Sequence, residues 1–126
     1  MTIRRLAVLV LIVAVGVADC GRRTGPTRVG MAISVDRLTR AVYADDPLTV
    51  QSLFDDAVRD SVTPTSVSDL GQRMRSMGGY QGVSLIGERA PGRYDFEALF
   101  DGGSMLLHVR FDPDGTIAAY RALPKE

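Results

Sequence analysis

The stretch that decides the fold is Arg93–Phe111, RYDFEALFDGGSMLLHVRF. On each side of its Asp-Gly-Gly-Ser centre, apolar and polar residues alternate with a period of two, which is the pattern of a half-buried strand. Gly102 and Gly103 can both adopt positive φ, as the two central positions of a type I′ turn require. The stretch therefore predicts an antiparallel β-hairpin with one apolar face.

The turn type also predicts a register for this hairpin. With the two glycines at the centre of the turn, Asp95 lies opposite Arg110 and Glu97 lies opposite His108 on the polar face. Cross-strand pairs of opposite charge contribute about 0.2–1 kcal/mol each. A slip by one residue would exchange the two faces. We therefore expect these four side chains to form two surface pairs.

A second turn, Asp112–Gly115, follows the hairpin. Its proline presets φ for the first central position of a type I turn, and its glycine supplies the left-handed residue that comes next. The resulting three-residue loop with a glycine bulge pairs Phe111 with Ile117 and, farther along, Leu107 with Arg121. This pairing places Arg121 on the inner face. It is either an anion-binding residue at a pocket mouth or a side chain that reaches water from a fraying strand end.

Three helices are predicted ahead of the hairpin. Apolar residues recur at helical spacing through Val29–Ala44, with a start expected near Ser34 or Asp36. Pro47, with Asp46 as its cap, begins the second helix. The apolar stripe expected on that second helix consists of Leu48, Leu53, Phe54, Ala57 and Val58.

The third helix is predicted from Ser66–Asp69, which resembles a capping box, to the glycine pair Gly78–Gly79. One more strand, Val83–Glu88, comes before the hairpin, with Ala90–Gly92 as its turn. Helices followed by an antiparallel meander indicate an α+β fold. We therefore expect N-terminal helices packed on a curved, roughly four-stranded antiparallel sheet.

Length and composition limit the functional classes. The chain has 126 residues, enough for one domain, and a formal net charge of zero. Without a basic excess, a general attraction to nucleic acid is not expected. Cys20 is the only cysteine, so an intrachain disulfide is excluded.

The first residues have the pattern of a targeting segment. Arg4 and Arg5 precede an apolar run, Leu6–Ala18, which is shorter than the 20 or so residues that span a membrane and fits the core of a signal peptide. The run ends at Val-Ala-Asp-Cys, residues 17–20, which resembles a bacterial lipobox except for Asp19. We expect lipidation of Cys20.

The expected boundaries are a signal peptide over residues 1–19, a tether over residues 20–30 and one domain over residues 31–126. The expected location is the cell envelope, with the protein exported and held by its lipid. Two alternatives stay open, namely plain secretion after ordinary cleavage and anchoring by an uncleaved N-terminal segment.

A helical stretch with an Asp-Pro break, a short capped helix ending in Gly-Gly, and the sequence FDPDGTI at 111–117 together resemble the nuclear transport factor 2-like superfamily, which has a cystatin-like α+β fold. Within it, the chain looks like small bacterial exported domains, including those that precede serine hydrolases of the β-lactamase and penicillin-binding type. The resemblance covers residues 34–124. It implies a curved sheet wrapped around the long helix, forming a cone with a pocket.

The chain carries no motif for a known catalytic centre. The Ser-x-x-Lys motif of those hydrolases is absent, because Lys125 is the only lysine and residue 122 is Ala. The single histidine, His108, is expected in surface pairing, and the spacing of metal ligands or of a phosphate-binding glycine loop is missing. We therefore predict no catalytic residue, cofactor or metal. Arg121, together with Tyr94 if it faces inward, is the candidate for ligand binding.

Three hypotheses for function follow. The first is a non-catalytic exported module that binds a partner protein of the envelope or a small ligand. The second is an isomerase or hydrolyase that works in the pocket of the cone. The third is a structural domain that forms homodimers through an outer sheet face exposing Leu106, Tyr120 and Ala122.

Overall fold

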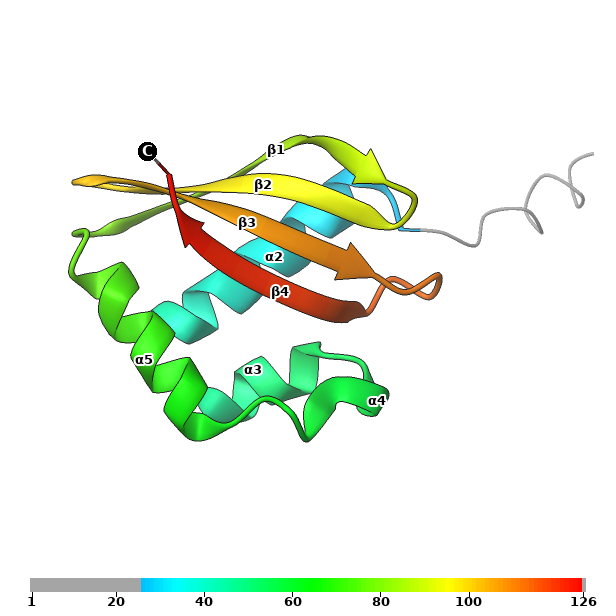
Figure 1. Ribbon diagram of the computed structural model, residues 1–126, viewed down its shortest axis with the longest axis horizontal. Coiled ribbons are helices and arrows are strands. Elements are labelled where there is room, and N and C mark those ends of the chain that lie inside the picture. The colour runs from blue at the N-terminus through cyan, green and yellow to red at the C-terminus, as the bar shows by residue number, and fades with distance from the viewer. Residues whose placement is uncertain (1–25, 126) are drawn as a thin grey trace, which may run out of the picture.

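The computed structural model describes residues 26–125 (Figure 1). The elements in chain order are α2 (Arg28–Tyr43), α3 (Pro47–Leu53), α4 (Asp56–Arg59), α5 (Pro64–Arg75), β1 (Tyr80–Ala90), β2 (Arg93–Phe100), β3 (Gly103–Phe111) and β4 (Ile117–Pro124). The strands form an open antiparallel sheet in the order β1-β2-β3-β4. Helix α2 crosses one face of this sheet, and α3, α4 and α5 lie below β4 in the view of Figure 1. The predicted α+β fold is confirmed.

Helix α2 begins earlier than predicted. It starts at Arg28, ahead of Ser34, because the hydroxyl of Thr27 accepts a hydrogen bond from the Gly30 amide at 2.9 Å and caps the first turn. The predicted tether over residues 20–30 therefore extends too far, since its last three residues belong to α2.

Helix α5 also starts before the predicted position. It begins at Pro64 because Thr63 is the N-cap and Ser66 is the third residue of a reciprocal capping box. The Thr63 hydroxyl accepts from the Ser66 amide at 3.1 Å, and the Ser66 hydroxyl accepts from the Thr63 amide at 3.3 Å. The helix ends at Arg75, before the predicted stop at Gly78.

The second predicted helix is divided in two. Asp46 caps α3 as expected, but the chain becomes extended at Phe54, which forms an isolated parallel bridge with Ile117. The Asp55 amide donates to the Ile117 carbonyl at 2.8 Å, and this contact with β4 ends the helix. Leu48 does not join the apolar stripe, because it is 77% exposed.

The core lies between α2 and the inner face of the sheet. Leu38 from α2, Phe96 from β2, Leu107 from β3 and Ile117 from β4 are all at most 1% exposed. The alternation predicted for β2 and β3 is confirmed, because their even-numbered and odd-numbered residues respectively supply this inner face.

The register of the β2–β3 hairpin differs from the prediction by two residues. Asp95 lies opposite His108, and Glu97 lies opposite Leu106. The predicted pairs Asp95–Arg110 and Glu97–His108 are therefore wrong. A shift of two residues returns every side chain to its original face, so the division into inner and outer residues is retained.

Contacts at the hairpin tip explain this shift. Neither Gly102 nor Gly103 has positive φ, so the type I′ turn does not form. Instead the Gly102 amide donates to the Met77 carbonyl at 2.7 Å, and the Asp101 amide donates to the Gly79 carbonyl at 3.0 Å. The chain that leads into β1 therefore sets the position of the tip.

The β3–β4 hairpin contains a bulge that the prediction missed. Gly115 is left-handed with φ 91°, and Phe111 pairs with Ile117, both as expected. The next pair, however, is Arg110 with Ala119, which leaves Ala118 without a partner. Beyond Ala118 each β4 side chain lies on the face opposite to that predicted.

Two site expectations change as a result. Arg121 lies opposite His108 on the outer face and is exposed, so its predicted inward orientation is wrong. Tyr120 and Ala122, expected on the outer face, pack against the core instead.

Candidate functional site

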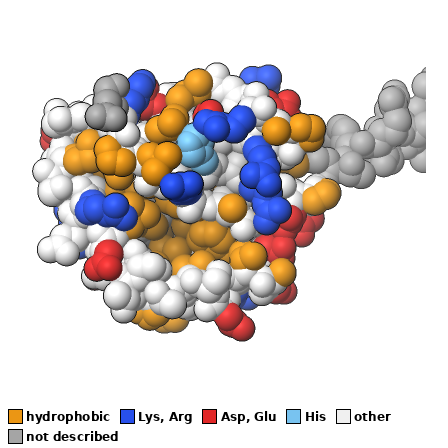
Figure 2. Space-filling model, in the orientation of Figure 1, with side chains coloured by type: hydrophobic (Ala, Val, Ile, Leu, Met, Phe, Trp, Pro, Cys, Tyr) orange, Lys and Arg blue, Asp and Glu red, His pale blue; other side chains and the backbone are white. Residues whose placement is uncertain are grey.

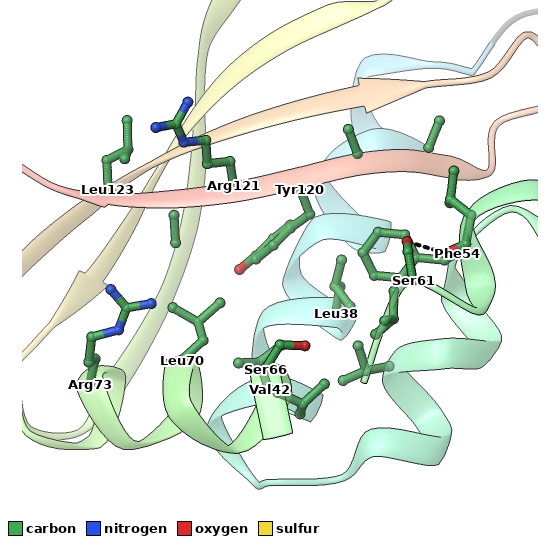
Figure 3. Close-up of a pocket in the computed structure, with 17 residues that line it drawn as sticks. Leu38, Val42, Phe54, Ser61, Ser66, Leu70, Arg73, Tyr120, Arg121 and Leu123 are labelled. Carbon is green, nitrogen blue, oxygen red and sulfur yellow. Dashed lines mark hydrogen bonds between the residues drawn. The ribbon is translucent and has the colours of Figure 1, made fainter. Parts of the chain in front are cut away.

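A groove of about 630 Å³ runs between β4 and the helices α3, α4 and α5. Figure 2 shows it as a recess with hydrophobic side chains at its base. The base includes Leu38 and Val42 of α2, while Val67 and Leu70 of α5 form the helical wall (Figure 3). The groove is an apolar concavity open to one side of the molecule.

The opposite wall is the edge of β4. Six consecutive residues, Ala118–Leu123, line the groove. Side chains of a strand alternate between the two faces of the sheet, so six residues in succession meet one cavity only where the strand presents its backbone. The sheet order makes β4 an edge strand. The groove therefore follows an open sheet edge.

The hydrogen-bond pattern identifies which backbone groups point into the groove. The Phe111 amide donates to the carbonyl of Gly92, which directly precedes β2. The backbone N–H and C=O of Phe111 therefore point toward β2 and away from β4. The direction of the backbone N–H and C=O groups alternates from residue to residue along an antiparallel strand, so those of Arg110 point toward β4 and bond to its partner Ala119. The same alternation then continues along β4 from Ala119.

The alternation directs the N–H and C=O of Tyr120 and Ala122 away from β3, toward the helices. Within residues 26–125 no strand, helix or side chain pairs with these four groups. Pro124, the last residue of β4, has no amide hydrogen to offer. At the other end, the Asp55 amide already occupies the Ile117 carbonyl. The unpaired edge is therefore short and has defined ends.

The Tyr120 side chain fixes β4 above the groove base. Its hydroxyl lies 2.8 Å from the hydroxyl of Thr39, which is fully buried. The Thr39 hydroxyl donates to the Val35 carbonyl at 2.8 Å, so Tyr120 is the donor in the pair. Burial raises the pKa of Tyr120 above its usual range, which keeps the phenol protonated. Tyr120 therefore anchors β4 to α2 as a neutral group.

The charged groups near the groove are arginines. Figure 3 shows Arg73 projecting from α5 toward β4 beside Leu70, whereas Arg121 points to the other side of the strand. The lining contains neither a carboxylate nor a histidine among the described residues. The groove can thus hold apolar groups along its length and an anion near Arg73, but it offers no paired acid and base.

The remaining predicted site residues lie outside this groove. Tyr94 is half-buried and meets Phe111 edge-on, with ring centroids 6.0 Å apart. His108 Nδ1 lies 2.7 Å from Asp95, and Arg89 reaches the same carboxylate at 3.0 Å. Desolvation acts against ionisation of Asp95, but hydrogen bonds from Arg89 and His108 lower its pKa overall.

Glu97 pairs with Lys125 at 2.6 Å instead of with His108. Hydrogen bonds from Lys125 and Ser104 lower the pKa of Glu97. Cys20, the predicted lipidation site, lies outside the described residues.

Two further features bear on the expectations. Among residues 26–125, no group of three or more potential ligands could hold a metal ion. None of the described helices combines the length and the apolar character needed to cross a bilayer.

No protein-family model matches the chain, and a search of curated proteins finds no similar sequence.

Sequence reasoning missed the open edge of β4. The local signal was present, because Ile117, Ala118 and Ala119 interrupt the strict alternation expected of a half-buried strand. Two successive residues that both turn toward the core, Ile117 and Ala118, are typical of a bulge. The opposing wall from α5 lies more than 40 residues away in sequence and left no local pattern.

Proposed function

We propose that this chain is a non-catalytic binding module that accepts an extended apolar segment of a partner protein as an additional strand on β4. The observation that carries the proposal is the open edge at Tyr120 and Ala122, which faces an apolar groove. Strand addition of this kind draws affinity from main-chain hydrogen bonds and specificity from pockets for alternate side chains.

The geometry limits the length of the segment. Its backbone would pair with the four free groups of Tyr120 and Ala122, between the contact at Ile117 and the end of the strand at Pro124. Alternate side chains of the segment would enter the groove against Leu70 and the residues at its base. A short segment of about four to six residues fits such an edge.

The charge of the groove adds a preference. Arg73 stands at the wall beside Leu70 and has no ion pair with a described residue. An acidic residue or a terminal carboxylate at the matching end of the segment would form a charge-assisted hydrogen bond there. The proposed ligand is therefore an apolar strand with an acidic end.

The test uses the full-length chain and fluorescently labelled hexapeptides of alternating Val and Thr that carry an Asp at one end. We expect binding that N-methylation of the peptide backbone weakens at least about tenfold, since each lost hydrogen bond costs about 0.5–1.5 kcal/mol. Ala122→Pro removes a groove-side amide without removing a bond to β3, and it should weaken binding similarly. Fluorescence anisotropy measures both effects.

A matched pair of α5 variants tests the apolar wall. Leu70→Asp places a charge beside the ligand and should weaken peptide binding, whereas Gln72→Asp, on the exposed side of α5, should leave it unchanged. Binding that is indifferent to N-methylation and to Ala122→Pro would contradict strand addition. Self-association that depends on Ala122 would instead identify a second copy as the occupant.

A small apolar ligand is the second candidate, and the groove volume favours it. About 630 Å³ falls within the range of roughly 300–1,000 Å³ that small-molecule sites occupy. Such a ligand would bind the Ala122→Pro variant as well as the parent, so the same variant separates the two candidates. An isomerase or hydrolyase has less support, because the described lining residues include no carboxylate or histidine to serve as a base.

Export and lipid anchoring belong to the same proposal, supported by the apolar run and by Cys20 at its end. The likeness to nuclear transport factor 2-like exported domains agrees with this location. We expect Cys20→Ala to move the protein from the membrane fraction to the soluble exported fraction. Unchanged fractionation together with a cleaved N-terminus would contradict lipidation.

A further inference from the structure

The outer face of the sheet carries a second concavity, which we call the basic hollow. Its volume is about 280 Å³, and the charged residues and the histidine that line it come from all four strands. They are Arg89, Arg93, Asp95, His108, Arg110 and Arg121. Figure 2 shows Lys and Arg side chains gathered around the histidine on this face. The hollow thus contains four guanidinium groups and one carboxylate.

The single carboxylate is already engaged. Asp95 accepts hydrogen bonds from two nitrogens of Arg89, the shortest at 3.0 Å, and lies 2.7 Å from His108 Nδ1. Arg93, Arg110 and Arg121 form no ion pair with any residue in the described range 26–125. Three positive charges around the hollow therefore have no carboxylate within ion-pair distance among the described residues, although Arg110 lies near enough to Asp112 to act on it electrostatically.

Two of these charges face each other directly. Arg93 of β2 lies opposite Arg110 of β3 in the sheet register. Like charges in directly opposed positions destabilise a sheet, so this arrangement is unfavourable unless an anion lies between them. The outer face also carries two favourable pairs, Asp95–His108 within the hollow and Glu97–Lys125 outside it. The hollow therefore combines one favourable pair with one repulsive pair, Arg93 and Arg110.

The bulge at Ala118 completes the hollow. It turns Ala119 and Arg121 outward, so that Ala119 lies beside Arg110 and Arg121 lies beside His108. A straight β4 would place Tyr120 and Ala122 on this face and Arg121 on the other. The small Ala119 side chain leaves space among the arginines, and bulges commonly redirect side chains at binding sites in this way.

We propose that the basic hollow binds a phosphate group. A phosphate presents several oxygens and up to two negative charges, which suits guanidinium groups that approach from different strands and can each bond through two nitrogens. The group can belong to a soluble phosphorylated molecule or to a lipid headgroup, because the chemistry at the arginines is the same. This site shares only the lining residues Ala119 and Arg121 with the groove, and it does not depend on the function proposed there.

In the experiment, the melting temperature of the full-length chain is measured at increasing concentrations of inorganic phosphate. A parallel series with chloride at the same ionic strength is the reference. We expect phosphate to stabilise the parent. Arg110→Gln should weaken apparent phosphate affinity by about tenfold, and Arg93→Gln should act similarly. The matched control is Arg37→Gln, which changes an exposed arginine of α2, the helix that packs on the opposite face of the sheet, and this variant should bind as the parent does. Equal affinity in the Arg110 and Arg37 variants would overturn the proposal.

A second measurement distinguishes the two sources of phosphate. The same variants are sedimented with vesicles of phosphatidylcholine, with or without phosphatidylglycerol. Any contribution of the N-terminal segment is common to all variants and cancels in the comparison. Loss of phosphatidylglycerol-dependent binding in Arg110→Gln and Arg93→Gln, but not in Arg37→Gln, supports a lipid headgroup. Loss of phosphate binding without a vesicle effect supports a soluble ligand. Absence of both effects overturns the site.

Discussion

The two hairpins of the sheet differ from their predicted registers by different numbers of residues. Whether that number is odd or even matters more than its size. The β2–β3 hairpin is displaced by two residues and keeps every side chain on its predicted face. Beyond Ala118, the β3–β4 hairpin is displaced by one residue and exchanges its faces. The smaller displacement therefore changed the inferred site, and the larger one changed only surface pairs.

The causes of the two displacements also differ. In the first hairpin, tertiary hydrogen bonds to the carbonyls of Met77 and Gly79 override the local preference of a glycine pair. In the second, the turn forms as its residues dictate, and the displacement comes from Ala118 within the strand. Turn chemistry thus predicts where a hairpin begins only when no tertiary contact competes with it, and the faces farther along depend on whether the strand is regular.

The largest expected effect comes from removing the bulge. Deletion of Ala118 would direct Arg121 toward the core and Tyr120 outward, and we expect the free energy of unfolding to fall by at least about 3 kcal/mol in a urea titration. Ala118→Gly keeps the extra residue and should cost only about 1 kcal/mol. A deletion that costs no more than this glycine substitution would show that the bulge does not set the faces of β4.

A smaller effect is expected at the inward-facing phenol. Tyr120→Phe removes the hydrogen bond to Thr39 and leaves the ring in place, so the free energy of unfolding should fall by about 1 kcal/mol. The measurement is thermal or urea unfolding of the full-length chain. If Tyr120 instead lay on the outer face, the substitution would have no measurable effect.

The register of the first hairpin is tested by double-mutant cycles in urea. Asp95→Asn combined with His108→Gln should give a coupling of about 0.5–1 kcal/mol, whereas Asp95→Asn with Arg110→Gln should couple little. The reverse result would restore the register predicted from the glycine pair.

Acid titration of the same Asp95→Asn variant gives a second check. Because the pKa of Asp95 is lowered in the folded protein, its stabilising contribution is complete above the unfolded value of about 4 and disappears as pH falls through the lowered pKa. The difference in free energy of unfolding between parent and variant should therefore approach zero at acidic pH. A difference that grows as pH falls would contradict the lowered pKa.

The smallest expected effect has the opposite sign. Arg110→Gln relieves the repulsion from Arg93 and should stabilise the protein by a few tenths of a kcal/mol in the absence of phosphate, as removal of opposed like charges does. Arg37→Gln, which faces no arginine across a strand, serves as the control for loss of charge alone. Destabilisation specific to Arg110→Gln would mean that Arg110 has a stabilising partner.

Much of the fold could be predicted because its signals are local. Strand alternation in β2 and β3, the Asp46–Pro47 helix start and the left-handed Gly115 each depend on a few neighbouring residues. The groove could not be predicted, since it depends on α5 standing opposite an edge strand distant in sequence. The basic hollow could not be predicted without knowing which face each β4 side chain occupies, and the unpaired Ala118 determines this.

The most direct test of the bulge and of the open edge is hydrogen exchange at single β4 amides, followed by NMR. We expect the amides of Ala119 and Arg121 to be protected, because they bond to β3, and those of Tyr120 and Ala122 to exchange rapidly. Addition of a bound strand peptide should then slow exchange at Tyr120 and Ala122. Protection of Tyr120 and Ala122 in the free protein, with rapid exchange at Ala119 and Arg121, would contradict both the register and the proposed binding edge.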